Sequence, residues 1–255
     1  MLTIFPIQAF SDNYIWAITI NGSKDLYVVD PGQSEPVVNY IAQHNLSLKG
    51  ILITHHHWDH TDGVTKLKQF YPDITVYGPQ NSIFTDSDIT LKQDDSINIL
   101  GVTFNILSTP GHTLDHICYY NCDILFCGDT LFSAGCGRLF EGTPKHMFHS
   151  LQKIAQLNKN CKVYCTHEYT EANIAFAQQV DPKNLEIQNY KQLTSSKRNN
   201  QLESLPSTIA QELKVNPYLK SLDPSNHFEI PKQYIKSINK PESNLANLRS
   251  YKDNF

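Results

Sequence analysis

The sequence predicts an α/β fold with a smaller helical region at its C-terminal end, and three observations support this. Short β-type runs separated by turn residues fill most of the first 165 residues. Amphipathic helical segments interrupt these runs, and a strand–helix–strand order implies a crossover with the helix packed on the sheet. From residue 170 onward, the remaining segments are typical of helices joined by polar stretches. We therefore expect a larger α/β domain over residues 1–169 and a small helical domain over residues 170–255.

The chain is expected to begin with a β-meander. Its three β-type runs cover residues 2–7, 14–20 and 26–29. Turn chemistry separates them, as at Asn21-Gly22. Ser34 is expected to cap the helix that follows, because apolar residues then recur at helical spacing. A buried strand is expected next over residues 50–53, and a short amphipathic helix from Val64 should end before Pro72.

The middle of the chain again alternates between β-type runs and turns. Strands are expected over residues 74–77, 89–91, 97–100, 102–107, 117–120, 124–127 and 162–165. Asp94-Asp95 and Gly101 supply turns between them. Thr143-Pro144 predicts the start of a helix with proline at its first position, running to about residue 157. In the C-terminal region, helices are expected over residues 172–180, 185–193 and 208–213.

The residues directly after the 50–53 strand carry four possible metal ligands within a six-residue stretch. These ligands are His55, His57, Asp59 and His60. His55 and His57 are two residues apart, so in an extended segment they point to the same side and can share one cation. Asp59 and His60 are adjacent, so we expect them to reach a second cation beside the first. A pattern of this density directly after a strand favours a metal site over a polar surface loop.

Three further strand ends each deliver one candidate ligand, namely His112, Asp129 and His167. Strand ends gathered along one sheet edge are where α/β enzymes build their sites. Five histidines and two aspartates exceed the four ligands of one tetrahedral zinc, so they predict two ions. We expect one ion on His55, His57 and His112, the other on Asp59, His60 and His167, and Asp129 as the bridge between them. His56 and Trp58 are expected to face away.

Imidazole and carboxylate ligands suit zinc, which is our first expectation, and also iron or manganese. Two such ions about 3.5–4 Å apart hold a water and lower its pKa from ~15.7 towards neutrality. The expected nucleophile is therefore a hydroxide that bridges the metals, with Asp59 and Asp129 as its catalytic partners. No thiolate is needed, and the six cysteines are expected to be reduced core thiols.

Composition excludes several classes of partner. The net charge of −4 argues against sequence-independent binding of nucleic acid, which requires a basic face. No apolar run approaches the length of a membrane span, and residues 1–6 lack the basic segment of a signal peptide. We therefore expect a cytoplasmic protein that binds neither nucleic acid nor membrane. A small-molecule substrate and a monomeric state are further expectations.

The ligand-bearing segments resemble those of the metallo-β-lactamase superfamily and, within it, the hydroxyacylglutathione hydrolase (glyoxalase II) family. Residues 54–60 match the signature T-H-x-H-x-D-H. The loop over residues 134–143 looks like the subfamily pattern A-G-C-G-(K/R)-x-(F/Y)-E-G-T, which is more specific. Further matching segments lie at residues 110–113, 128–132, 166–169, 216–219 and 245–255. The resemblance covers essentially the whole chain.

This resemblance implies an αββα sandwich of two sheets with helices outside, followed by a helical domain. It implies hydrolysis of S-lactoylglutathione to glutathione and D-lactate, the second step of methylglyoxal detoxification. By the same resemblance, glutathione is held by Arg138, Tyr169, Arg249 and Lys252. Phe140 stands where some members carry Tyr, and Arg138 stands where others carry Lys. On the residues alone, Arg249 and Lys252 would instead be placed on a solvated helix face.

Other readings of this fold remain open. A glutathione persulfide dioxygenase would use a single iron, lack the long helical domain and not need Asp59, His60 and His167. A β-lactamase or lactonase would be a different metallo-β-lactamase-fold hydrolase, although no secretion signal is present. An RNA-processing nuclease is disfavoured by the acidic balance. A catalytically inactive binding module would be expected to have lost ligands, and all seven candidates are present.

Overall fold

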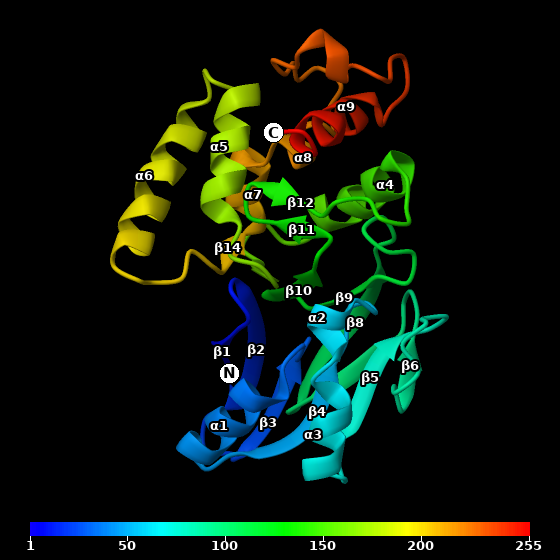
Figure 1. The fold of residues 1–255 in the computed structure, drawn as a ribbon, viewed down its shortest axis with the longest axis vertical. Helices are drawn as coiled ribbons and strands as arrows, with labels where there is room; N and C mark the ends of the chain where they lie inside the picture. The colour runs from blue at the N-terminus through cyan, green and yellow to red at the C-terminus, as the bar shows by residue number, and fades with distance from the viewer. The chain divides into compact units, whose positions relative to one another are not determined.

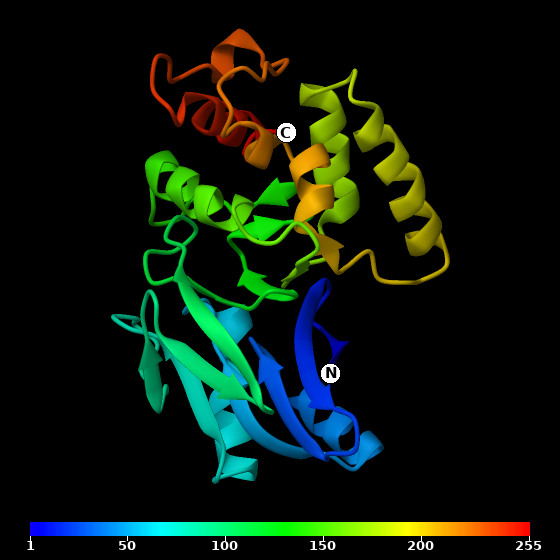
Figure 2. The same ribbon diagram turned by 180° about the vertical axis from the view of Figure 1, so that it is seen from behind.

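The computed structural model describes residues 1–255, which fall into two compact units (Figures 1 and 2). Unit 1 comprises Met1–Ser108, Asp115–Asn121 and Leu125–Gly128, and unit 2 comprises Thr109–Leu114, Cys122–Ile124 and Asp129–Phe255. The predicted division after residue 169 stays a prediction. No helix is both long and apolar enough to cross a membrane.

The first sheet of unit 1 has six strands in sequence order, β1-β2-β3-β4-β5-β6. They are β1 (Leu2–Ala9), β2 (Asn13–Ile20), β3 (Asp25–Val29), β4 (Ser47–Leu52), β5 (Thr75–Pro79) and β6 (Ile89–Leu91). The first three are antiparallel, as a meander requires, and β3 to β6 are parallel. Parallel neighbours need crossovers. These are supplied by α1 (Ser34–His44) before β4, and by the short α2 (Trp58–Thr61) and α3 (Val64–Phe70) before β5.

The apolar faces of α1 and α3 cover one face of this sheet (Figure 1). Val37 and Ile41 of α1 and Val64 and Leu67 of α3 join the strand residues in one buried cluster. Burial of this surface is the main stabilising term for such a layer. It also fixes the strand ends from which the loops at residues 30 and 53–57 depart.

The second six-stranded sheet has the order β14-β13-β10-β9-β8-β7. Its strands are β7 (Ser96–Ile99), β8 (Val102–Ser108), β9 (Ile117–Tyr120), β10 (Ile124–Gly128), β13 (Lys162–Cys165) and β14 (Ser207–Thr208). Within unit 1, the fully buried Tyr119 of β9 donates a hydrogen bond to the carbonyl oxygen of Ile53 at 2.8 Å. That bond joins the second sheet to the segment directly after β4. Within unit 1, the buried side chain of Tyr119 thus links the two sheets.

Unit 2 contains the short hairpin β11 (Leu131–Phe132) and β12 (Gly135–Cys136) and most of the helices. The helices are α4 (Pro144–Ala155), α5 (Thr170–Val180), α6 (Leu185–Asn199), α7 (Ile209–Val215), α8 (Pro217–Lys220), the 3₁₀ turn η1 (Lys232–Tyr234) and α9 (Ser243–Lys252). The side-by-side helices α5 and α6 share a buried cluster that includes Ile174 and Tyr190 (Figure 2). Thr143 caps α4 with Pro144 at its first position, so the predicted start of that helix is confirmed.

The structure differs from the sequence prediction at several places. Gln33, not Ser34, holds the N-cap position of α1, and Ser34 is already helical. The helix α6 continues to Asn199 instead of ending near residue 193, and Lys197 and Arg198 in its last turn suit the negative end of the helix dipole. The hairpin β11–β12 has two residues per strand, which is too short to produce a detectable alternation.

Candidate metal centre

The loop after β4 places two histidines at the spacing of two ligands on one cation. His55 is fully buried, and its Nε2 lies 3.1 Å from Nδ1 of His57. Zinc–nitrogen bonds of about 2.0–2.1 Å in a tetrahedron separate two ligand atoms by about 3.3 Å, so this distance fits. The ring of His116, also buried, stacks on His55 at 4.8 Å. His116 is therefore a core histidine.

Asp59 and His60 lie on the short helix α2, which the sequence did not predict. Their side chains approach each other, with Asp59 Oδ2 3.6 Å from His60 Nε2. Asn13, at the start of β2, donates from its side chain to Asp59 Oδ2 at 3.1 Å. This hydrogen bond orients the carboxylate. No sequence motif had indicated Asn13.

Asp30 is a supporting residue that sequence reasoning missed. It follows β3 in the left-handed region, with φ of 51°. Its carboxylate lies 2.9 Å from His60 Nδ1 and accepts from both the backbone N (2.8 Å) and the hydroxyl (2.7 Å) of Thr54. When Nδ1 of a histidine donates to a carboxylate, Nε2 is left to coordinate a metal. The sequence did contain one indication of this role, because Asp30 is a carboxylate directly after β3, the strand that pairs with β4.

Within unit 2, Asp129 lies between the other two candidate histidines. Its Oδ2 is 3.4 Å from Nε2 of His112 and 3.4 Å from Nε2 of His167. All three side chains are nearly buried. The sequence analysis assigned these histidines to different ions. One carboxylate equidistant from both has the geometry expected of a bridge.

Backbone groups fix the orientation of His112. Its Nδ1 donates to the carbonyl oxygen of Arg138 at 2.8 Å, which leaves Nε2 as the ligand atom. The backbone N–H groups of Phe140 and Glu141 both donate to the carbonyl oxygen of His112. Gly137 is required here, because a Cβ would lie 2.0 Å from the carbonyl oxygen of Asp129. The segment 137–141 thus supports a ligand and carries two predicted substrate residues.

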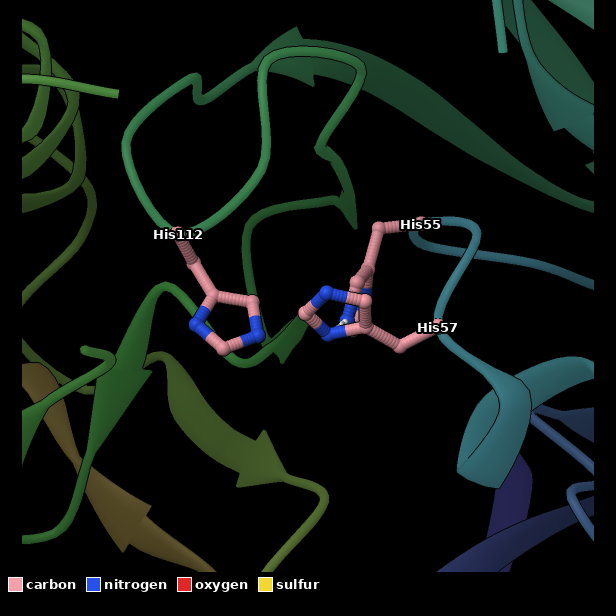
Figure 3. A group of neighbouring side chains, drawn as sticks. All are labelled: His55, His57 and His112. Atoms are coloured by element: carbon pink, nitrogen blue, oxygen red, sulfur yellow. Dashed lines mark hydrogen bonds between the residues drawn. The ribbon is translucent and has the colours of Figure 1, made fainter. Parts of the chain in front are cut away.

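The candidate ligand atoms form groups whose members all lie within 4.8 Å of one another. These groups are His55, His57 and His112; His55, His60 and Asp129; and Asp59, His60 and His167. Figure 3 shows the first group, with His55 and His57 on the loop after β4 and His112 on the loop after β8. The first and third groups are the two sets expected from the sequence. Borderline donors of this kind, without thiolate, fit zinc, iron or manganese.

Two predicted substrate residues flank the histidines of unit 2. The exposed ring of Phe140 stands edge-on to His112, with ring centroids 5.2 Å apart. Tyr169 stacks on His167 at 4.7 Å and remains 38% exposed. Arg138 is also exposed, and its Nε lies 3.4 Å from Oδ1 of Asp253. All three side chains are therefore accessible from solvent.

Arg249 is not on a solvated helix face, whereas Lys252 is half-buried. Arg249 is buried and donates to the carbonyl oxygen of Cys136 at 2.9 Å and to Asp253 Oδ1 at 2.7 Å. The ammonium of Lys252 donates to the carbonyl oxygen of Ala172 at 3.1 Å. Burial, and secondly the charge of Arg249, lower the pKa of Lys252 to about 8. Asp253 thus bonds to one of these cationic side chains and lies beside Arg138, which the sequence did not indicate.

A buried carboxylate holds the start of the 133–142 loop. Glu212 of α7 accepts from the hydroxyl of Ser133 at 3.0 Å and from the backbone N of Ala134 at 2.8 Å. Asn216 donates to Glu212 and to the carbonyl oxygen of Gly135. Burial raises the pKa of Glu212 above its ordinary value. This network anchors the loop to the helical region, and no sequence motif had singled out Glu212.

The remaining predictions have mixed outcomes. Trp58 is 60% exposed and packs against Phe10, so it faces away as expected. His56 Nδ1 lies 3.0 Å from Asp115 Oδ1. All six cysteines are free, and five are buried as predicted. Cys122 is exposed, which corrects the prediction, because it lies in the turn between β9 and β10.

The comparisons with known proteins cover the whole chain. The family model "Metallo-beta-lactamase superfamily" matches residues 11–84 and 77–167, and "Hydroxyacylglutathione hydrolase C-terminus" matches residues 168–255. A hydroxyacylglutathione hydrolase of Pseudoalteromonas translucida is 52% identical over 100% of both chains. One from Shewanella pealeana is 45% identical, again over 100% of both.

Among solved structures, ETHE1 from Myxococcus xanthus matches with a TM-score of 0.64 and 23% identity. The match covers 85% of this chain and 83% of that one. With the mixed sheets, the covering helices and the helical C-terminal region, it confirms the predicted fold class. The chain belongs to the hydroxyacylglutathione hydrolase family of the metallo-β-lactamase superfamily.

Proposed function

We propose that the chain hydrolyses hydroxyacylglutathione thioesters, converting S-lactoylglutathione to glutathione and D-lactate. The strongest support is that this chain is 52% identical to a hydroxyacylglutathione hydrolase over the full length of both chains. The match of residues 168–255 to that family's C-terminal region supports the same activity. The dioxygenase alternative was expected to lack the long helical domain, so this match disfavours it.

The seven candidate ligands would hold two divalent metal ions, with zinc as the first candidate and iron or manganese as the others. The position of Asp129 Oδ2, 3.4 Å from both His112 Nε2 and His167 Nε2, supports a bridging role. His55 and His57 would complete the ion of His112, and Asp59 and His60 that of His167. When bound, two such ions supply Lewis acidity and lower the pKa of a water towards neutrality.

The chain's own contribution at this centre is orientation. Asn13 fixes the Asp59 carboxylate, and Asp30 fixes the tautomer of His60. A thioester needs little help from a general acid, because a thiol with a pKa near ~8.5 leaves readily as thiolate. Water supplies the oxygen of the new carboxylate, and the carbon–sulfur bond breaks. Protonating the leaving group therefore needs no dedicated residue.

Glutathione would be recognised by the cationic and hydroxyl groups of unit 2. Its two carboxylates suit charge-assisted hydrogen bonds from Arg138 and Lys252, with a further bond from the hydroxyl of Tyr169. Arg249 is proposed to contribute its charge, because its guanidinium already donates to Asp253 and to Cys136. Phe140 offers an apolar edge where a tyrosine would offer a hydroxyl.

The test is a substrate panel assayed with the metal-loaded protein. S-lactoylglutathione should be hydrolysed with a kcat/KM well above those for a simple acyl thioester, a lactone and a β-lactam. Glutathione persulfide should not be oxidised. Faster turnover of a lactone or β-lactam, or oxygen consumption with the persulfide, would contradict the proposed function. Monomeric state and cytoplasmic location stay predictions, the first testable by light scattering.

A further inference from the structure

We infer that Asp115 is a positioning residue for the metal loop, the segment 53–57 that carries His55 and His57. Asp115 acts through His56, the residue between the two ligands. The inference deepens the proposed function and rests on that function's metal requirement. Asp115 is not among the seven candidate ligands.

The metal loop has no regular secondary structure between β4 and α2, so side chains must hold it. At its start, Asp30 accepts two hydrogen bonds from Thr54. At its end, the hydroxyl of Thr61 donates to the carbonyl oxygen of His57 at 3.0 Å. The middle of the loop is anchored by His56, whose Nδ1 lies 3.0 Å from Asp115 Oδ1.

The Asp115 carboxylate is itself held in place. Its Oδ2 accepts a hydrogen bond from the hydroxyl of Ser82, and that hydroxyl accepts from the backbone N of Phe84 at 3.1 Å. The side chains of His56 and Asp115 are only 10% and 5% exposed. A hydrogen bond shielded from water in this way is geometrically restrictive. The arrangement therefore fixes the imidazole of His56 relative to the sheet.

Fixing His56 also fixes its neighbours. His56 lies between His55 and His57 in the chain, so anchoring its side chain restrains the backbone from which both of these side chains project. The 3.1 Å separation of their ligand nitrogens requires both rings to stay on one side of the loop. Loss of the His56 anchor allows the peptide planes around it to rotate. The two ligand atoms would then no longer be held ready for one ion.

The experiment measures zinc affinity by competition with a chromophoric chelator. D115A should raise the zinc dissociation constant by about tenfold, the lower end of the effect of removing a residue that orients metal ligands. D115N should retain near wild-type affinity, because an Asn oxygen can still accept from His56 Nδ1. T65A is the matched control, since it removes an exposed side-chain hydrogen bond of the same unit, between Thr65 and Asp86.

Two further variants test the mechanism. H56A should weaken zinc binding as much as D115A does, and the double variant should be no weaker than either single one. If D115A does not fold, H56A carries the same test. Wild-type affinity in both D115A and H56A, or equal losses in D115A, D115N and T65A, would overturn the inference. These outcomes are independent of the proposed substrate, because the zinc assay needs no turnover.

Discussion

The candidate metal ligands and the candidate glutathione residues are built in opposite ways. The candidate ligands lie on short segments after strands or on the short helix α2, and hydrogen bonds orient their side chains, as the carbonyl oxygen of Arg138 orients His112. The glutathione residues come from three distant parts of the chain, and their exposure ranges from 7% for Arg249 to 61% for Phe140. Asp253 contacts Arg249 and lies beside Arg138. The candidate ligands are thus oriented by local hydrogen bonds, whereas Arg138 and Arg249 share a charge network through Asp253.

Substitutions in the candidate metal ligands and in the candidate glutathione-binding residues should therefore affect different kinetic parameters. Removing a ligand, or a residue that orients one, should change metal content and kcat. Changing a glutathione residue should change KM and leave metal content alone.

Asp129→Ala should have the largest effect, because a bridging carboxylate serves both ions. Bound metal ions stabilise the transition state by several kcal/mol, so their loss should lower kcat/KM by about a thousandfold. Elemental analysis should find reduced occupancy of both ions. A variant that retains two ions and near-normal turnover would show that the bridge lies elsewhere.

Asp30→Ala should weaken metal binding by about 10–100-fold, because such carboxylates orient the histidine they contact. The variant should recover kcat as metal is added in excess, which separates it from Asp129→Ala. Isothermal titration with zinc measures the change. Unchanged affinity would remove Asp30 from the metal centre and leave it a structural residue of the β3 end.

Lys252→Ala should raise KM for a glutathione thioester by roughly tenfold, because losing one side of a charge-assisted contact costs on the order of 1.5–3 kcal/mol. The kcat should change far less. A simple acyl thioester without the glutathione carboxylates serves as the control substrate and should be indifferent. If both substrates lose kcat equally, Lys252 does not act in recognition. Arg249→Ala should raise KM similarly, but its contact with Cys136 makes it a less specific probe.

The pH dependence of KM should also identify Lys252. Its pKa is lowered to about 8 by burial and by Arg249, and a carboxylate binds the protonated form. KM for the glutathione thioester should therefore be low below pH 8 and rise as the pH passes through that value. Lys252→Arg should abolish the rise, since arginine stays charged. A wild-type KM that is flat to pH 9 would contradict the assignment.

Phe140→Tyr should have the smallest effect. It restores the hydroxyl that some members of the resembled family carry, and one exposed neutral hydrogen bond is worth about 0.5–1.5 kcal/mol. KM should fall by a few-fold with unchanged metal content. A change in metal content would mean that the ring contact with His112 matters more than the hydroxyl.

The grouping of the candidate ligand side chains could be predicted because the information is local. The alternation of His55 and His57 after an apolar run, and single ligands at other strand ends, follow from strand geometry alone. The residues that orient the candidate ligands could not be predicted, because each lies far in the sequence from the side chain that it contacts. Asp30 reaches His60 from a neighbouring parallel strand, and Asp115 reaches His56 across 59 positions.

The helical region was the least predictable. The sequence around Arg249 is typical of a surface helix. The side chain is nevertheless buried, and it donates hydrogen bonds to Cys136 and Asp253. Such burial depends on tertiary contacts between segments more than 100 residues apart, and helical periodicity carries no trace of them. The extension of α6 to Asn199 was missed for a different reason, because its last turns are polar throughout.

A metal titration tests the two-ion account most directly. Metal-free protein would be titrated with zinc while hydrolysis of S-lactoylglutathione is followed. We predict that activity rises until two equivalents are bound, with elemental analysis giving about two ions per chain in the fully active protein. Full activity at one equivalent, with no second ion bound, would contradict the account.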